Sequence, residues 1–138
     1  MTDFVLDCSI ALSWAFDDES SELADAVMQR LRDGKALVPG IWRLEISNGL
    51  AIGERRGRLS SEKIGGFLKR LSFMSIVIDP NTSDRAFGSV LELSRRERLT
   101  AYDATYLDLA LRNRIGLATA DRALAAAAAR NGVAIVTG

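Results

Sequence analysis

Five short apolar segments, each of three or four residues, alternate along this chain with longer segments of helical periodicity. The apolar segments show little alternation of polar and apolar residues, which is typical of strands covered by helices on both faces. They span Asp3–Leu6, Ala36–Val38, Ser75–Ile78, Gly116–Ala118 and Ala134–Val136. This order predicts a three-layer α/β/α fold with a five-stranded, mainly parallel sheet.

The segments between these strands place apolar residues three and four positions apart, as expected for helices that pack one face against a sheet. We expect helices over Asp18–Asp33, Ile41–Arg56, a segment that begins at Ser60 or Ser61, a segment within Pro80–Arg98, Tyr102–Asn113 and Arg122–Asn131. No stretch has the composition of a linker or an internal repeat, so we interpret residues 1–138 as a single domain.

The absence of histidine excludes several kinds of active site. Serine and cysteine hydrolases that use a histidine base are excluded, and so are zinc sites that need histidine or several cysteines. The only cysteine, Cys8, cannot form an internal disulfide, which suits a reducing compartment. No segment approaches the roughly 20 apolar residues of a membrane span, and the N-terminus does not resemble a signal peptide. We therefore expect a cytoplasmic protein with no membrane partner.

Four acidic residues lie next to apolar segments, where a carboxylate is costly unless a cation pairs with it. Asp7 and Asp121 fall just past the ends of expected strands, where α/β proteins place their functional sites. Glu45 lies in the middle of an expected helix, and Asp103 lies in the first turn of another. Because oxygen-rich sites favour hard divalent cations, we interpret these acids as a Mg²⁺ or Mn²⁺ site.

Such a site would supply hydrolytic chemistry without histidine. A divalent metal lowers the pKa of a water molecule and stabilises negative charge on phosphate oxygens. The sequence therefore predicts metal-assisted cleavage of phosphodiester bonds, with the four acids as metal ligands and catalytic residues. Whether one or two ions take part stays open.

Each of these acids also has a simpler explanation when it is considered alone. Asp7, Asp103 and Asp121 fall at helix N-termini, where carboxylates cap the helix or interact favourably with its dipole. Glu45 would be an ordinary surface residue, although Asn48 lies on the same helical face and offers it a polar neighbour. The metal hypothesis depends on their convergence, because clustered carboxylates without a cation raise one another's pKa and reduce stability.

Asp108 is left out of the predicted site. It lies five residues after Asp103, so the two side chains point in different directions on a helix. Arg112 follows Asp108 by four residues, which is the spacing of an ordinary surface ion pair.

The net charge is zero, so attraction of nucleic acid would depend on local clusters of basic residues. Arg55, Arg56 and Arg58 lie at the end of one expected helix, and Arg122 directly follows one of the four acids. Arginine suits bidentate contact with phosphate, so we take these four residues as candidate RNA contacts. The alternative is that they are solvated residues at helix ends.

Several motifs resemble those of PIN-domain ribonucleases, and specifically the toxin subunits of VapBC-type toxin–antitoxin pairs. The resemblance extends over nearly the whole chain. It is carried by Val5–Ser9, Leu44-Glu45, Leu99–Leu107 and Leu117–Leu124. The most specific part is the segment Tyr-Asp-Ala-x-Tyr-Leu followed by Thr-x-Asp.

The resemblance implies a five-stranded parallel sheet between helices, with the four acids binding Mg²⁺ or Mn²⁺ in an enzyme that cuts RNA. Ser9 and Thr119 match hydroxyl positions beside these acids. The resemblance also implies a homodimer that a cognate antitoxin holds inactive by wrapping around it. Related toxins are associated with transfer RNA or ribosomal RNA, and the sequence does not distinguish between these substrates.

Two other α/β families with clustered acids fit less well. A phosphoacceptor receiver domain needs a lysine after its last strand, and the segment Ala134–Gly138 contains none. A haloacid-dehalogenase-like phosphatase needs a second aspartate two residues after Asp7, where Ser9 stands. The alternative that stays open is a PIN-like module that binds RNA or protein and is catalytically silent, although the presence of all four acids argues against it.

Overall fold

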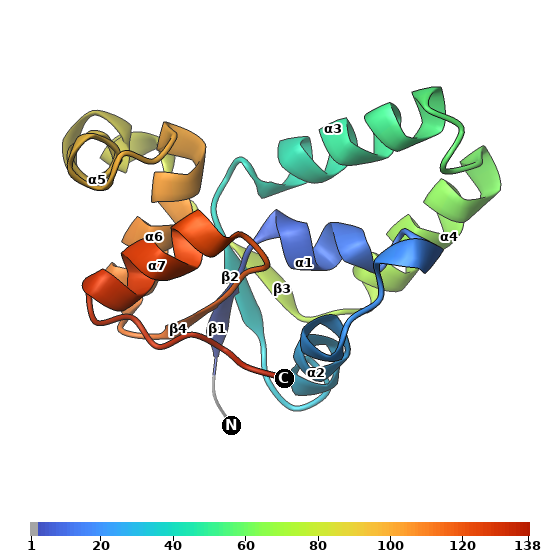
Figure 1. Cartoon of the computed structure of the whole chain (residues 1–138), viewed down its shortest axis with the longest axis horizontal. Coiled ribbons are helices and arrows are strands. Elements are labelled where there is room, and N and C mark those ends of the chain that lie inside the picture. The colour runs from blue at the N-terminus through green and yellow to red at the C-terminus, as the bar shows by residue number, and fades with distance from the viewer. Residues whose placement is uncertain (1–2) are drawn as a thin grey trace.

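A parallel sheet of four strands forms the centre of the computed structural model, which describes residues 3–138 (Figure 1). The strands are β1 (Phe4–Leu6), β2 (Ala36–Val38), β3 (Ile76–Ile78) and β4 (Gly116–Ala118), and their order in the sheet is β3-β2-β1-β4. All adjacent pairs are parallel, and each strand coincides with a predicted one. The α/β prediction is confirmed. Of the domain expected over residues 1–138, the first two residues lie outside the described part.

The predicted fifth strand, Ala134–Val136, is wrong as a strand, because only Ile135 forms a parallel bridge, with Leu117 of β4. Leu117 donates its N–H to the carbonyl of Ala134 and accepts one from Val136, both at 2.9 Å. The chain reaches this sheet edge only after a turn at Gly132, whose φ of 76° lies in the left-handed region. The segment therefore pairs with β4 through a single residue pair, Ile135 and Leu117.

Helices cover both faces of the sheet (Figure 1). The helices that come between β1 and β3 in the chain are α1 (Cys8–Ser13), α2 (Glu22–Arg30), α3 (Trp42–Arg55) and α4 (Ser61–Ser72). The helices that come after β3 are α5 (Leu91–Glu97), α6 (Ala101–Asn113) and α7 (Arg122–Arg130). Right-handed crossovers toward opposite edges of the sheet place the two sets on opposite faces. Figure 1 shows α6 and α7 across the sheet from α1 and α2, with α3 and α4 forming a hairpin beyond α1.

Side-chain caps set where four of these helices begin. In α2, α4, α6 and α7 the side chain of the preceding residue accepts a backbone N–H of the first turn; these caps are Ser21, Ser60, Thr100 and Asp121. The helix predicted over Asp18–Asp33 is consequently shorter than expected, because Ser21 starts α2 and only a 3-10 turn, Asp17–Glu19, precedes it.

The segment before α6 is less regular than the predicted helix within Pro80–Arg98. A 3-10 turn, Ser83–Arg85, and a π-helical segment, Ala86–Val90, precede α5. Gly88 has φ −106° and ψ −107°, values outside the helical region, so the helix is kinked there. The glycine permits this kink, which the periodicity of the apolar residues does not reveal.

Helix α6 is the most deeply buried helix of the fold. Residues 104–110 are all buried, and the helix packs against β1, β2 and β4. Even α6 is not a membrane span, since no helix in the described part of the chain is both long and apolar enough to cross a bilayer. Because α6 is packed against these strands, the side chains that α6 directs toward the strand ends have fixed positions.

The predicted ion pair between Asp108 and Arg112 is present, but its predicted place at the surface is wrong. Asp108 is only 4% exposed, and Arg85 donates to both of its carboxylate oxygens at 2.6 and 2.9 Å. Arg112 also contacts Asp108, at 3.3 Å, and makes a second, two-pronged ion pair with the buried Asp79. Hydrogen bonds from Arg112 and Thr82 outweigh the effect of burial and lower the pKa of Asp79. This buried network joins α6 to the end of β3.

Candidate active site

Asp7 lies directly after β1 and is almost fully buried, with 4% of the residue exposed. Its Oδ2 atom accepts hydrogen bonds from the hydroxyl groups of Ser9, at 2.7 Å, and Thr119, at 2.6 Å. Burial raises the pKa of the Asp7 carboxyl, and the hydrogen bonds offset this rise only in part. Asp7 occupies the N-cap position of α1 but makes no side-chain capping bond, so capping does not explain it.

The same two hydroxyl groups join the end of β1 to the loop after β4. Ser9 Oγ accepts the backbone N–H of Ala120, and Thr119 Oγ1 accepts that of Asp121, both at 3.0 Å. Asp121 caps α7 through its Oδ1 atom, as the capping explanation expected. The cap also fixes the Asp121 carboxylate near Asp7, where its negative charge contributes to the raised pKa of Asp7.

Glu45 lies in the first turn of α3 rather than in the middle of a helix. Its side chain is partly buried, and Oε1 accepts a hydrogen bond from the hydroxyl of Tyr106 at 2.5 Å. Burial raises the pKa of Glu45, and the negative charges of Asp7 and Asp103 add to the rise. Glu45 is therefore directed into the protein, unlike an ordinary surface residue.

Asp103 lies in the first turn of α6, where the Thr100 hydroxyl accepts its backbone N–H at 3.0 Å. Burial raises the pKa of the Asp103 carboxyl, and the charges of Asp121 and Asp7 raise it further. Each of the four predicted acids is therefore coupled to at least one of the others by electrostatic repulsion. The fold brings all four toward the carboxyl ends of β1 and β4, where the direction of chain crossover reverses and ligands bind in α/β sheets.

The chemistry of these acids fits a divalent cation. Within residues 3–138, none of the four forms a salt bridge with lysine or arginine, so the protein leaves their negative charge uncompensated. Carboxylate oxygens are the ligands that Mg²⁺ and Mn²⁺ favour. In the same part of the chain, no three acidic or cysteine side chains are grouped closely enough to hold an ion as they stand. Binding would therefore require side-chain rotations that bring the oxygens together.

Residues 4–130 match the family model described as the PIN domain. The chain belongs to the PIN-domain family. Members of this family are generally nucleases that use divalent metal ions. The predicted resemblance is confirmed at the level of the family, while the more specific VapC type stays a prediction.

Two solved structures share the fold of this PIN domain. PAE2754 from Pyrobaculum aerophilum is 24% identical, with a TM-score of 0.69 over 98% of this chain and 91% of that one. FitAcB from Neisseria gonorrhoeae is 18% identical, with a TM-score of 0.63 over 97% of this chain and 96% of that one. No curated protein matches the sequence. At these identities the likeness concerns the fold alone.

Cys8 lies among the acids of the PIN domain but is not suited to act as a nucleophile. Burial strongly raises the pKa of its thiol, and the negative charges of Asp7 and Glu45 raise it further. The thiol therefore stays protonated at neutral pH.

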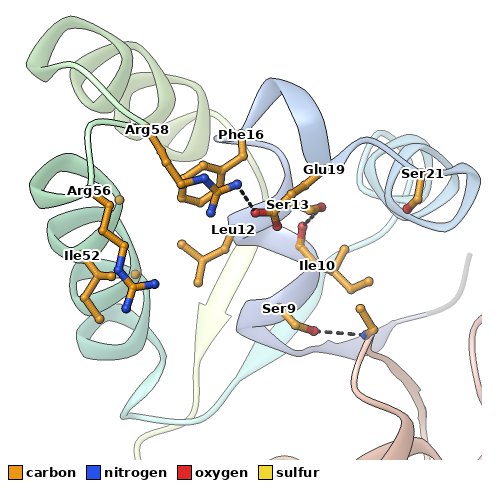
Figure 2. Close-up of a pocket in the computed structure, with 13 residues that line it drawn as sticks. Ser9, Ile10, Leu12, Ser13, Phe16, Glu19, Ser21, Ile52, Arg56 and Arg58 are labelled. Atoms are coloured by element: carbon orange, nitrogen blue, oxygen red, sulfur yellow. Dashed lines mark hydrogen bonds and ion pairs between the residues drawn. The ribbon is translucent and has the colours of Figure 1, made fainter.

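A groove of about 470 Å³ opens beside the acids, between α1 and α3 (Figure 2). Ser9 and Ala120 line the end of the groove next to Asp7, and Arg56 and Arg58 line the opposite end. The groove therefore connects the acidic end of the sheet with a basic region at the end of α3.

The candidate RNA contacts have different environments. Arg58 binds Asp18 at 3.0 Å and Glu19 at 2.7 Å, and its guanidinium carbon lies 4.2 Å from the centre of the Phe16 ring. Arg58 is thus engaged within the fold, whereas Arg56 extends along the groove without such partners (Figure 2). The other two candidate RNA contacts, Arg55 and Arg122, and the predicted supporting residue Asn48 have exposed side chains, which make no hydrogen bond or ion pair within residues 3–138.

Tyr106 is the residue of the site that our sequence reasoning did not identify. It lies three residues after Asp103 on α6, so both side chains lie on the same face of the helix. That spacing is a signal that can be read from the sequence. Its partner Glu45 is 61 positions away, which no local pattern reveals.

Proposed function

We propose that this PIN domain is a Mg²⁺- or Mn²⁺-dependent endoribonuclease and the toxin component of a toxin–antitoxin pair. The observation that carries the proposal is the convergence of Asp7, Glu45, Asp103 and Asp121, three of which have a raised pKa. Acids held together at a cost to stability, without a basic partner, are expected where a cation binds.

Each acid would have a defined role in this site. Asp7 is held by two hydroxyl groups, and Asp121 is held by its cap, so these two carboxylates would be rigid ligands. Asp103 and Glu45 would complete the ligand set from α6 and α3. A bound Mg²⁺ or Mn²⁺ would lower the pKa of a water molecule and offset the charge of the scissile phosphate.

The proposed substrate is RNA, with transfer RNA and ribosomal RNA as candidate targets. Arg56 in the groove and Arg122 beside Asp121 are the arginines best placed to contact phosphate, because both side chains are exposed and free of ion pairs within residues 3–138. Neutralising each phosphate contact should weaken binding and reduce its dependence on salt.

The proposed protein partners are a cognate antitoxin and a second copy of the chain, in a cytoplasmic setting. The groove between α1 and α3 supports the antitoxin proposal, since its lining combines apolar residues with access to Ser9 beside Asp7. On the opposite face of the sheet, Phe87 is 95% exposed and Leu91 is 44% exposed at a spacing of four residues. This apolar pair supports self-association.

Cleavage of RNA by purified, partner-free protein tests the enzymatic proposal. We expect cleavage with Mg²⁺ or Mn²⁺, no cleavage with EDTA, and loss of at least about 100-fold in rate for Asp7→Asn and Asp103→Asn, because ligands should matter more than outer-shell residues. Asp33→Asn is the control, since Asp33 is exposed and remote in sequence from the four acids.

A catalytically silent binding module is the second candidate, and it is favoured because residues 3–138 contain no preformed cluster of metal-binding side chains. Binding of RNA with no metal-dependent cleavage, unaffected by Asp7→Asn, would establish that reading. Cleavage that persists in EDTA would contradict both candidates.

A further inference from the structure

The two tyrosines of this chain lie one helical turn apart on α6 but have opposite environments. Tyr106 is fully buried, with 0% exposed, while Tyr102 is 62% exposed. A buried phenol requires a hydrogen-bond partner for its hydroxyl group. That partner is Oε1 of Glu45, at 2.5 Å.

Glu45 is an acid of the site whose long side chain needs such a partner. Hydroxyl groups hold Asp7 and a helix cap holds Asp121, but Glu45 has a longer side chain and therefore more rotational freedom to lose. Asp7 and Asp103 also repel its carboxylate. Without a restraint, the Glu45 carboxylate would gain free energy by turning away from the other acids toward solvent.

Tyr106 is well placed to provide this restraint. It lies between buried residues in the most buried part of α6, so its ring has no room to move. Asp103 lies one turn earlier on the same helix. Helix α6 therefore carries one acid of the site and, through Tyr106, holds a second acid that belongs to α3.

We propose that Tyr106 is a positioning residue that holds the Glu45 carboxylate in the orientation required for divalent-cation binding. The proposal rests on the proposed metal-dependent function and adds to it a residue that touches neither metal nor substrate. Tyr106 acts through Glu45, and the thiol of Cys8 lies beside the same pair. The effect of Tyr106 on metal affinity is the 10–100-fold that is typical of groups that orient a metal ligand.

The test is Mn²⁺ binding, measured by calorimetry on the whole chain, with Tyr102→Phe as the matched control. Tyr106→Phe keeps the buried ring and removes only the hydroxyl group. We expect this variant to bind Mn²⁺ about 10–100-fold more weakly, and Tyr102→Phe to bind it like the wild type. Wild-type affinity in Tyr106→Phe would overturn the inference.

A double-mutant cycle separates positioning from a general structural effect. If Tyr106 acts through Glu45, then Tyr106→Phe should cause no further loss of Mn²⁺ affinity when it is added to Glu45→Ala, which removes the hydrogen-bond acceptor. An equal loss in both backgrounds would overturn the inference while leaving the metal site intact. Absence of Mn²⁺ binding by the wild type would overturn the proposed function itself, so the two failures are distinguishable.

A spectroscopic measurement keeps the test valid even if Tyr106→Phe does not fold. The Tyr102→Phe variant retains Tyr106 as the sole tyrosine, and ultraviolet resonance Raman bands of tyrosine report the hydrogen bond made by its hydroxyl group. We expect the bands to indicate a strong donor and to shift when Mn²⁺ is added or when Glu45→Gln is introduced. Bands unchanged by both would overturn the inference.

Discussion

Thr119 donates a hydrogen bond to Asp7 at 2.6 Å, although the two residues are 112 positions apart in the sequence. The bond is buried and joins the ends of β1 and β4. These two parallel strands flank the point in the sheet where the crossover connections change direction. Thr119 also accepts the backbone N–H of Asp121. One hydroxyl group thus sets the distance between two of the four acids.

We expect Thr119→Val to weaken Mn²⁺ binding and RNA cleavage by about 10–100-fold, because the Asp7 carboxylate loses one of the groups that orient it. Thr119→Ser retains the hydroxyl group and should stay close to the wild type. Calorimetry and a cleavage assay on both variants check this prediction. A loss in Thr119→Ser together with wild-type binding and cleavage in Thr119→Val would show that the methyl group matters and the hydrogen bond does not.

The stability of the metal-free protein should increase as the pH falls from neutral toward the ordinary carboxyl pKa of about 4. Asp7, Glu45 and Asp103 have raised pKa values in the folded protein, so between the ordinary carboxyl pKa of about 4 and the folded value the native state binds more protons than the unfolded state. Their destabilising effect is complete above the folded pKa and is relieved as the pH drops through it.

Urea unfolding at several pH values measures this dependence. Asp103→Asn should flatten it and should stabilise the metal-free protein at pH 8, since one carboxylate of the repelling cluster is removed. Saturating Mg²⁺ should stabilise the wild type most at the alkaline end. A free energy of unfolding that decreases as the pH is lowered from neutral toward the ordinary carboxyl pKa of about 4, in the absence of metal, would contradict the predicted repulsion.

Arg112→Met should destabilise the protein by about 3–5 kcal/mol at neutral pH, because it leaves the buried Asp79 without its cationic partner. The pKa of Asp79 is lowered in the folded protein, so the contribution of this ion pair is present above the ordinary pKa of about 4 and is lost as the pH falls through the folded value.

The destabilisation by Arg112→Met, measured by urea unfolding, should therefore shrink in acid. Arg95→Met serves as the control, since Arg95 is exposed and makes no ion pair within residues 3–138. A deficit below about 1 kcal/mol at neutral pH would show that the buried network contributes no more than a surface pair.

Two helical glycines should respond to alanine in opposite directions. A Cβ atom at Gly53 of α3 would lie 2.9 Å from the buried Phe16 ring, so Gly53→Ala should cost about 1–3 kcal/mol through overpacking. Gly65 of α4 faces open space, so Gly65→Ala should stabilise the protein by up to about 1 kcal/mol through helix propensity.

Thermal or urea unfolding of the two glycine variants gives the comparison directly. Because the substitution is the same and both residues lie within helices, the difference between them isolates the close approach of α3 to Phe16, which follows α1 in the chain. Stabilisation by Gly53→Ala would indicate that Phe16 can move aside at little cost.

Much of the fold follows from local patterns in the sequence. Uninterrupted apolar runs such as Phe4–Leu6 and Gly116–Ala118 are strands because helices cover both of their faces. The same reasoning predicted one strand too many, at Ala134–Val136. An apolar segment does not show how many of its residues will pair with the neighbouring strand. Gly88 similarly breaks a helix whose periodicity is otherwise continuous.

The candidate site could be predicted only as far as strand ends and helix starts determine it. Asp7 and Asp121 follow strands, and their position is fixed once the sheet order is known. The bond from Tyr106 to Glu45 depends on how α6 meets α3, a matter of tertiary packing. Asp108 was misassigned for the same reason, because its main partner, Arg85, comes from a distant segment that periodicity does not connect with α6.

The most direct test of the proposed cation site is calorimetric titration of the metal-free protein with Mn²⁺, compared across the wild type, Asp7→Asn, Asp103→Asn and the control Asp33→Asn. We predict saturable binding by the wild type and by Asp33→Asn, and binding weakened by at least about 100-fold in the other two variants. Affinity that is the same in all four proteins, or absent from all four, would contradict the conclusion that these acids form a cation site.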